Sequence, residues 1–142
     1  ENPKITDLQV KLLNDNIISP DQDISFEISY DVNEDIETYI AFSLTDIDRG
    51  IWIYNDNSMD NKTSGSGRKT LTYKCSLAHL NNIKLKLQVS VRDNDDQMIA
   101  FVDSDNSPVI LLNRTDIEDD DKSAKDSATG MVQRNGKWEI QE

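Results

Sequence analysis

The residues of this chain best suited to molecular recognition are aromatic rings and hydrogen-bonding side chains on three expected strands. They are Tyr39, Ser43, Trp52, Tyr54, Gln88, Ser90 and Arg92. A sugar ring has an apolar C–H face and a rim of hydroxyls, so flat rings beside hydrogen-bonding groups suit a carbohydrate. The same alternation allows the opposite assignment, in which Trp52 and Tyr54 lie in the core while Ile51 and Ile53 face solvent.

Residues typical of catalysis are sparse. The single histidine, His79, falls in an expected turn without an obvious nucleophile beside it. Gly65, Ser66 and Gly67 form too short a stretch for a phosphate-binding loop and lack the lysine that such loops contain. We therefore expect no catalytic residues and no cofactor in this domain, and we do not expect it to be an enzyme.

Acidic residues gather in expected loops at 31–37, 93–96, 103–105 and 118–121. Carboxylates in loops can bind calcium, but none of these clusters has the spacing or the glycine of an EF-hand. Solvated loops explain them more simply, so we expect no metal ligands. An extracellular adhesion or structural β-sandwich domain, stabilised by calcium, stays open as the alternative class of protein.

Composition limits the class of partner. The 142 residues include 15 basic and 27 acidic side chains, for a formal net charge of -12. Proteins that bind nucleic-acid phosphates carry a basic patch, so we expect no nucleic-acid partner. Cys75 is the only cysteine, which rules out an internal disulfide framework. No apolar run approaches the roughly 20 residues of a membrane-spanning helix.

Apolar and polar residues alternate along much of the chain with the period of two that is typical of β-strands. Expected strands cover 8–12, 24–32, 36–46, 51–55, 71–77, 83–92, 98–103 and 107–113. This pattern predicts an all-β fold, an immunoglobulin-like antiparallel β-sandwich. In such a sandwich the strands at 36–46, 51–55 and 83–92 are neighbours, which would gather the candidate binding residues on one sheet surface. The polar stretch 55–67 is expected to be a mobile loop.

The chain divides into a sandwich domain at 1–114, an acidic linker at 115–129 and a C-terminal strand or hairpin at 130–142. The last segment carries Met131 and Val132 before an Asn-Gly pair at 135–136, and Trp138 and Ile140 after it. Asn-Gly is a strong hairpin signal. Such apolar residues after an acidic linker need a partner surface, either on the same domain or on a second copy, and they are the candidate dimerisation residues.

Several segments together resemble one known family. They are PKITDLQVKLLND near the start, ISFEISYDVNEDIETYIAFSLTDIDRGIWIYNDNS, LQVSVRDND and the closing GMVQRNGKWEI. In order and pattern they resemble the C-terminal carbohydrate-binding domain of Wzt, the ATP-binding subunit of O-antigen polysaccharide ABC transporters. The resemblance spans nearly the whole chain as a succession of strands and turns.

The resemblance implies a non-catalytic domain that recognises the terminal part of a lipid-linked O-antigen polysaccharide and so takes part in its export. It implies a homodimer in which the last strands are swapped between protomers. It also implies a missing upstream ATPase domain that contacts the membrane-spanning exporter subunit. The expected location is cytoplasmic, peripheral to the inner membrane of a Gram-negative bacterium. Sugar specificity varies in this family, so no binding residue is transferred from it.

Overall fold

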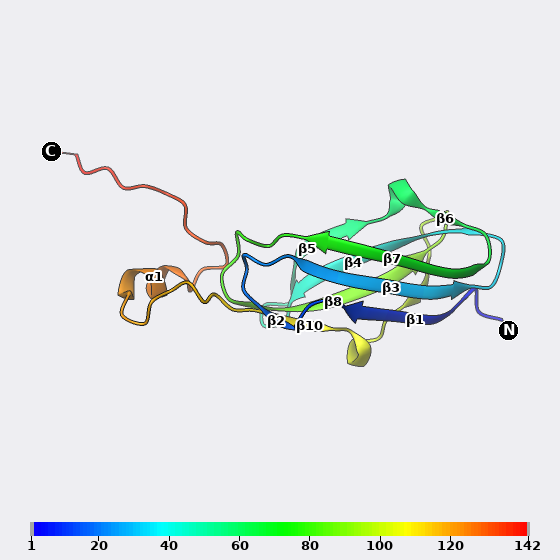
Figure 1. Ribbon diagram of the computed structural model, residues 1–142. Helices are drawn as coiled ribbons and strands as arrows, with labels where there is room; N and C mark the ends of the chain where they lie inside the picture. The colour runs from blue at the N-terminus through cyan, green and yellow to red at the C-terminus, as the bar shows by residue number, and fades with distance from the viewer. Residues whose placement is uncertain (1, 142) are drawn as a thin grey trace.

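The computed structural model describes residues 2–141. Glu1 of the predicted sandwich domain and Glu142 of the predicted C-terminal segment lie outside the described residues. Figure 1 shows elongated strands in layers, with the C-terminal segment extending away from them. One sheet has the order β1 (Ile5–Leu12), β3 (Ile24–Val32) and β7 (Gly67–Cys75). Both pairings in it are antiparallel.

The second sheet has the order β2, β10, β8, β4, β5. Its strands are β2 (Ile17–Ile18), β10 (Val109–Leu112), β8 (Ile83–Arg92), β4 (Glu37–Asp46) and β5 (Ile51–Asn57). Two short strands join its flanks, since β6 (Thr63–Ser64) pairs with β4 and β9 (Met98–Phe101) pairs with β8. The predicted all-β sandwich is confirmed. One pairing departs from the expected antiparallel arrangement, because β2 and β10 are parallel.

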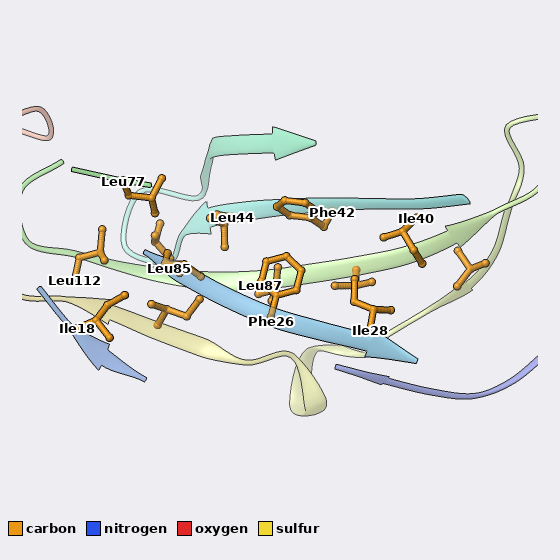
Figure 2. Close-up of a cluster of buried hydrophobic side chains, with 14 of the residues drawn as sticks. Ile18, Phe26, Ile28, Ile40, Phe42, Leu44, Leu77, Leu85, Leu87 and Leu112 are labelled. Atoms are coloured by element: carbon orange, nitrogen blue, oxygen red, sulfur yellow. The ribbon is translucent and has the colours of Figure 1, made fainter. Parts of the chain in front are cut away.

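The core lies between the two sheets and follows the sequence alternation. Along β3, every second residue from Ile24 to Val32 is buried, and β8 buries Leu85 and Leu87 in the same way. In Figure 2, Phe26 of β3 and Phe42 of β4 lie close together, and their ring centroids are 5.1 Å apart in an edge-to-face arrangement. This regular burial places the alternate residues of β4 and β8 on the outer face of the second sheet.

The expected mobile loop at 55–67 is instead structured. It continues β5 to Asn57, forms the 3₁₀ turn η1 (Met59–Asn61) and then forms β6. Hydrogen bonds order it: the Ile40 amide donates to the Ser58 Oγ at 2.8 Å, and the Thr38 and Thr63 hydroxyls are 3.0 Å apart. The prediction was wrong because it considered only apolar burial, whereas polar side chains here bond to β4.

The predicted acidic linker at 115–129 contains one short helix, α1 (Lys122–Ser127), which follows the 3₁₀ turn η2 (Ser104–Asn106) and β10. The Asp121 side chain caps α1 by accepting from the Ala124 amide at 3.0 Å. A carboxylate at this position satisfies an otherwise unpaired amide of the first turn, which explains a helix in so polar a stretch.

After α1 the chain returns to the sandwich, where the buried side chain of Asn81 holds it by hydrogen bonds. Its Nδ2 donates to the carbonyl oxygens of Gly130 at 2.7 Å and Val132 at 3.1 Å. Its Oδ1 accepts from the Arg114 guanidinium at 2.9 Å, and its backbone N–H donates to Met131 O at 3.0 Å. Asn81 therefore fastens the start of the C-terminal segment to the turn before β8.

Beyond this attachment the predicted hairpin is not formed within the chain. Leu80 and Val132 make a single antiparallel bridge, and no strand follows it among the described residues up to 141. Trp138 is 99% exposed and Ile140 is 87% exposed. Figure 1 shows this segment pointing away from both sheets. The tail therefore folds back on its own domain over its first residues, where Met131 packs against the core and Val132 pairs with Leu80, and it does not do so at Trp138 and Ile140.

Candidate functional site

The strand register gathers most of the candidate binding residues on the outer face of the second sheet. Ser43 of β4 lies opposite Gln88 of β8 and opposite Asn55 of β5. One step along, Ala41 lies opposite Ser90, which in turn lies opposite Phe101 of β9. The expected adjacency of these three strands is confirmed, because β8, β4 and β5 follow one another in the sheet.

A shallow groove of about 620 Å³ lies over this face. Its lining includes Ser43, Trp52, Asn55, Asn57, Gln88, Ser90, Arg92, Met98 and Phe101. The groove has polar residues along β4 and β8 and large apolar side chains on the flanking strands β5 and β9. Trp52 on one flank is 72% exposed, and Phe101 on the other is 65% exposed.

Tyr54 does not lie on this surface, contrary to the prediction that paired it with Trp52. The pairing of β4 with β5 shifts between Leu44, which lies opposite Tyr54, and Thr45, which lies opposite Trp52. This bulge adds a residue to β5 and resets its alternation. Trp52 consequently faces solvent while Tyr54 packs against the core, so neither of the two assignments considered from the sequence was right.

The inward position of Tyr54 is fixed by contacts with the opposite sheet. Its hydroxyl lies 2.6 Å from the hydroxyl of Tyr73, which also donates to the Asp56 carboxylate. The rings of Tyr54 and Phe42 stack with centroids 6.0 Å apart. Burial raises the pKa of Tyr73 well above its usual range, and the hydrogen bond to Asp56 is the second-largest cause. This cluster joins β5 to β7, and because the hydroxyls of Tyr54 and Tyr73 bond within it, neither is available to the groove.

Tyr39 lies on the expected face but does not line the groove. It is only 3% exposed, because the Lys62 ammonium lies 5.6 Å from its ring centroid and its hydroxyl donates to Asp96 at 2.8 Å. Burial and the Asp96 carboxylate raise the pKa of Tyr39. Tyr39 therefore holds the turn at 93–96 beside Arg92 and shapes the end of the groove without reaching into it.

Met98 and Phe101 were not recognised from the sequence as site residues. They are three positions apart, so a strict period of two would place them on opposite faces. The pairing of β8 with β9 shifts between Val91 and Arg92, which puts Phe101 opposite Ser90 and Met98 opposite Arg92. Both side chains therefore face outward, and sequence alternation alone gave no signal of this.

The groove can supply two kinds of contact to one ligand. The Gln88 amide oxygen accepts from the Thr45 hydroxyl at 2.8 Å, which leaves the Gln88 NH₂ group as a donor. Ser43 and the asparagines of β5 add further hydroxyl and amide groups, whereas the hydroxyl of the buried Ser90 donates to the Ala41 carbonyl oxygen at 3.4 Å. Trp52 and Phe101 add flat apolar surfaces. A ligand with both hydroxyls and apolar faces matches this arrangement.

Neither metal ligation nor a membrane-spanning helix is indicated by the described residues. Within 2–141, no group of three or more His, Cys, Asp or Glu side chains is placed to hold a metal ion. No helix in the same range is long and apolar enough to cross a membrane.

The two packed sheets form a β-sandwich domain with a groove on one sheet face. Among solved structures, the chain is similar to the crystal structure of the C-terminal domain of Wzt, with a TM-score of 0.63 at 12% identity. The similarity covers 99% of this chain and 86% of that one, which confirms the expected resemblance at the level of the fold. Another similar structure is a Pyrococcus furiosus CARDB domain in complex with di-metal ions. Its TM-score is 0.48 at 11% identity, over 80% of this chain and 99% of that one. Neither a protein-family model nor a curated protein matches the sequence.

The turn that joins β4 to β5 positions Trp52 and depends on Asp46. The Asp46 carboxylate is fully buried, pairs with the Arg49 guanidinium at 2.7 Å and accepts from the amides of Asp48 at 2.9 Å and Arg49 at 3.0 Å. Burial alone would raise the pKa of Asp46. The bonds from Arg49 and Asp48 outweigh it and hold the pKa below its usual value.

We expect Asp46→Asn to lower the free energy of unfolding at pH 7 by roughly 2–3 kcal/mol, because it removes charge-assisted bonds from a buried group. The lowered folded-state pKa means that the stabilisation is present above the unfolded-state pKa of about 3.9 and is lost as the pH falls through the folded value. Urea unfolding at pH 7 and at successively lower pH should show the difference between wild type and variant shrinking below about pH 4. The exposed Asp48→Asn serves as the control. A difference that stays constant with pH would contradict this role of the carboxylate.

Proposed function

We propose that this domain is a non-catalytic carbohydrate-binding module that recognises the terminal part of a lipid-linked O-antigen polysaccharide for export by an ABC transporter. The observation that carries the proposal is the groove, with polar side chains on β4 and β8 between Trp52 on β5 and Phe101 on β9. The flat rings suit the C–H faces of sugars and the polar residues suit hydroxyls. The fold similarity to the C-terminal domain of Wzt supports the same function.

Arg92 is the residue that we expect to reorient when a glycan binds. Its Nη1 makes one long hydrogen bond, 3.4 Å, to the Asp96 carbonyl oxygen. Its Nε is buried and has no hydrogen-bond partner among the described residues. An unpaired buried donor costs roughly 1–3 kcal/mol, so a rotation that places the guanidinium on glycan oxygens gains bonds and loses little.

The proposal extends to the homodimer. The end of the chain after Arg134 alternates in its last residues, with Trp138 and Ile140 on one side and Lys137 and Glu139 on the other. Both apolar side chains are almost fully exposed in the single chain. We propose that this segment adds as a strand to a sheet edge of a second protomer, with Met131 and Val132 at the crossing point.

The cellular setting follows from the same reading. The domain would work in the cytoplasm, peripheral to the inner membrane of a Gram-negative bacterium, joined to an ATPase domain upstream. That ATPase would contact the membrane-spanning exporter subunit. This proposed setting is supported by the family resemblance of the sequence together with the fold similarity.

A fluorescence titration tests the proposed carbohydrate binding. The chain has two tryptophans, and the exposed Trp138 can be changed to Phe so that Trp52 alone reports. Lipid-free O-polysaccharide from the strain that encodes the chain should give a saturable change in Trp52 emission, while dextran should give none. Calorimetry on the unmodified chain provides the second readout. Failure of both methods to detect the O-polysaccharide would contradict the proposed function.

A further inference from the structure

A second concavity lies beyond the β9 side of the groove. Its volume is about 470 Å³, and residues 5–8 of β1 and 98–101 of β9 line it. These two strands belong to different sheets and lie side by side, since β1 pairs with β3 and β9 pairs with β8. The concavity therefore lies where one flank of the sandwich passes from one sheet to the other.

An irregularity of β1 shapes this concavity. The pairing of β1 with β3 shifts between Thr6 and Gln9, and Asp7 has a positive φ of 52°. The Asp7 carboxylate turns toward the Arg68 guanidinium, 2.9 Å away, which stabilises this unusual backbone conformation. Because β1 and β9 are edge strands, their backbone N–H and C=O groups on this side are available to an added ligand.

The groove and the second concavity share Met98 and Phe101. Met98 is 54% exposed and Phe101 is 65% exposed. The two side chains thus form an apolar ridge with a hollow on each side. From β5 to β9, three strand spacings of about 4.8 Å make the groove about 14 Å across, which is longer than a single sugar ring.

We propose that the two concavities are successive subsites for one oligosaccharide. The glycan lies across the strands from Trp52 to the ridge formed by Phe101 and Met98, and continues beyond the ridge along β1. This inference rests on the proposed carbohydrate function and deepens it, because it makes a stretch of several sugar residues the recognised unit. A strand of another protein at the free edges of β1 and β9 is the competing occupant. The ridge shared with the groove favours the glycan.

The test is calorimetric titration with size-fractionated oligosaccharides, prepared from the O-polysaccharide of the encoding strain by mild acid hydrolysis. For the wild type, affinity should rise about tenfold from the shortest binding fragment to one that fills both subsites, and then level off. Thr6→Tyr places a ring in the second concavity and leaves the groove unchanged. We expect it to reduce the affinity of long fragments to that of short ones. Lys11 is an exposed residue of β1 outside both concavities, so Lys11→Tyr should change the affinity of neither the short nor the long fragments.

The outcomes separate this inference from the function on which it rests. Binding that does not depend on fragment length, or long fragments that bind Thr6→Tyr as tightly as wild type, would overturn the second subsite and leave the groove intact. A change in oligomeric state caused by Thr6→Tyr, with glycan affinity unaltered, would overturn it in favour of strand addition. Absence of binding at every length would overturn both the subsite and the proposed function.

Discussion

Trp52→Ala should reduce the affinity for the O-polysaccharide at least tenfold, a loss of about 1.4 kcal/mol or more in binding free energy. The indole is 72% exposed on the flank of the groove, so it has apolar surface that a sugar ring can cover. Aromatic residues at such positions dominate the binding energy of many recognition surfaces. The melting temperature should stay nearly unchanged, because the side chain contributes little to the core.

Two variants on the same strand control for general effects of substitution on β5. Ile51→Ala removes a 45% exposed apolar side chain that does not line the groove, so the affinity should not change. Tyr54→Phe removes the hydroxyl that contacts Tyr73 and should lower stability without lowering affinity. Calorimetric titration and thermal unfolding of the three variants separate binding from folding. An unchanged affinity for Trp52→Ala would remove Trp52 from the site.

Truncation after Gln133 should convert the proposed dimer into a folded monomer. The residues removed begin at Arg134 and include Trp138 and Ile140, which make no strand within their own chain. The chain would keep its backbone attachments to the sandwich, including the bond from the Gln133 backbone N–H to His79 O at 2.7 Å, and would lose the bonds from Arg134 to Ser123 and Ser127 of α1. Light scattering coupled to gel filtration would report the mass, and circular dichroism the fold. A truncated chain that remains a stable dimer would contradict strand exchange.

Truncation after Asp126 should have a different and more damaging result. It also removes Gly130 and Val132, whose carbonyls are the acceptors for the buried Asn81 side chain. Leaving a buried amide without partners costs roughly 1–3 kcal/mol, and Leu80, now only 2% exposed, would lose its cover. Comparison of the two truncations therefore separates the role of the tail in assembly from the role of its first residues in folding.

The strands with unbroken alternation were predicted well. In β3 every second residue is buried, and in β8 Leu87, Val89 and Val91 lie opposite the buried Leu44, Phe42 and Ile40 of β4, so pattern and tertiary environment agree. The polar residues between them, Ser43, Gln88 and Ser90 among others, were correctly placed on one sheet surface. The resemblance to the Wzt domain also rests on this succession of strands, which explains why it survives at 12% identity.

The misplaced residues lie where a local irregularity changes the register. The bulge in β5 separates Trp52 from Tyr54, and the shift between β8 and β9 brings Met98 and Phe101 to one face. A single inserted residue reverses every later side chain, and its position depends on hydrogen bonds with a neighbouring strand. The ordered segment at 55–67 was missed for a related reason, since its partner is β4 and not a local residue.

The sequence by itself determined the all-β class, the strands of the core and the polar face of β4 and β8, because each depends on a period of two that is written in consecutive residues. Only the tertiary structure decided which aromatic residues border the groove, that Tyr39 and Tyr54 do not line it, and that backbone hydrogen bonds attach the tail to the sandwich as far as Gln133. Those outcomes depend on bulges and on hydrogen bonds between residues distant in sequence. Their energies are set by the partner strand, which no local pattern of residues specifies.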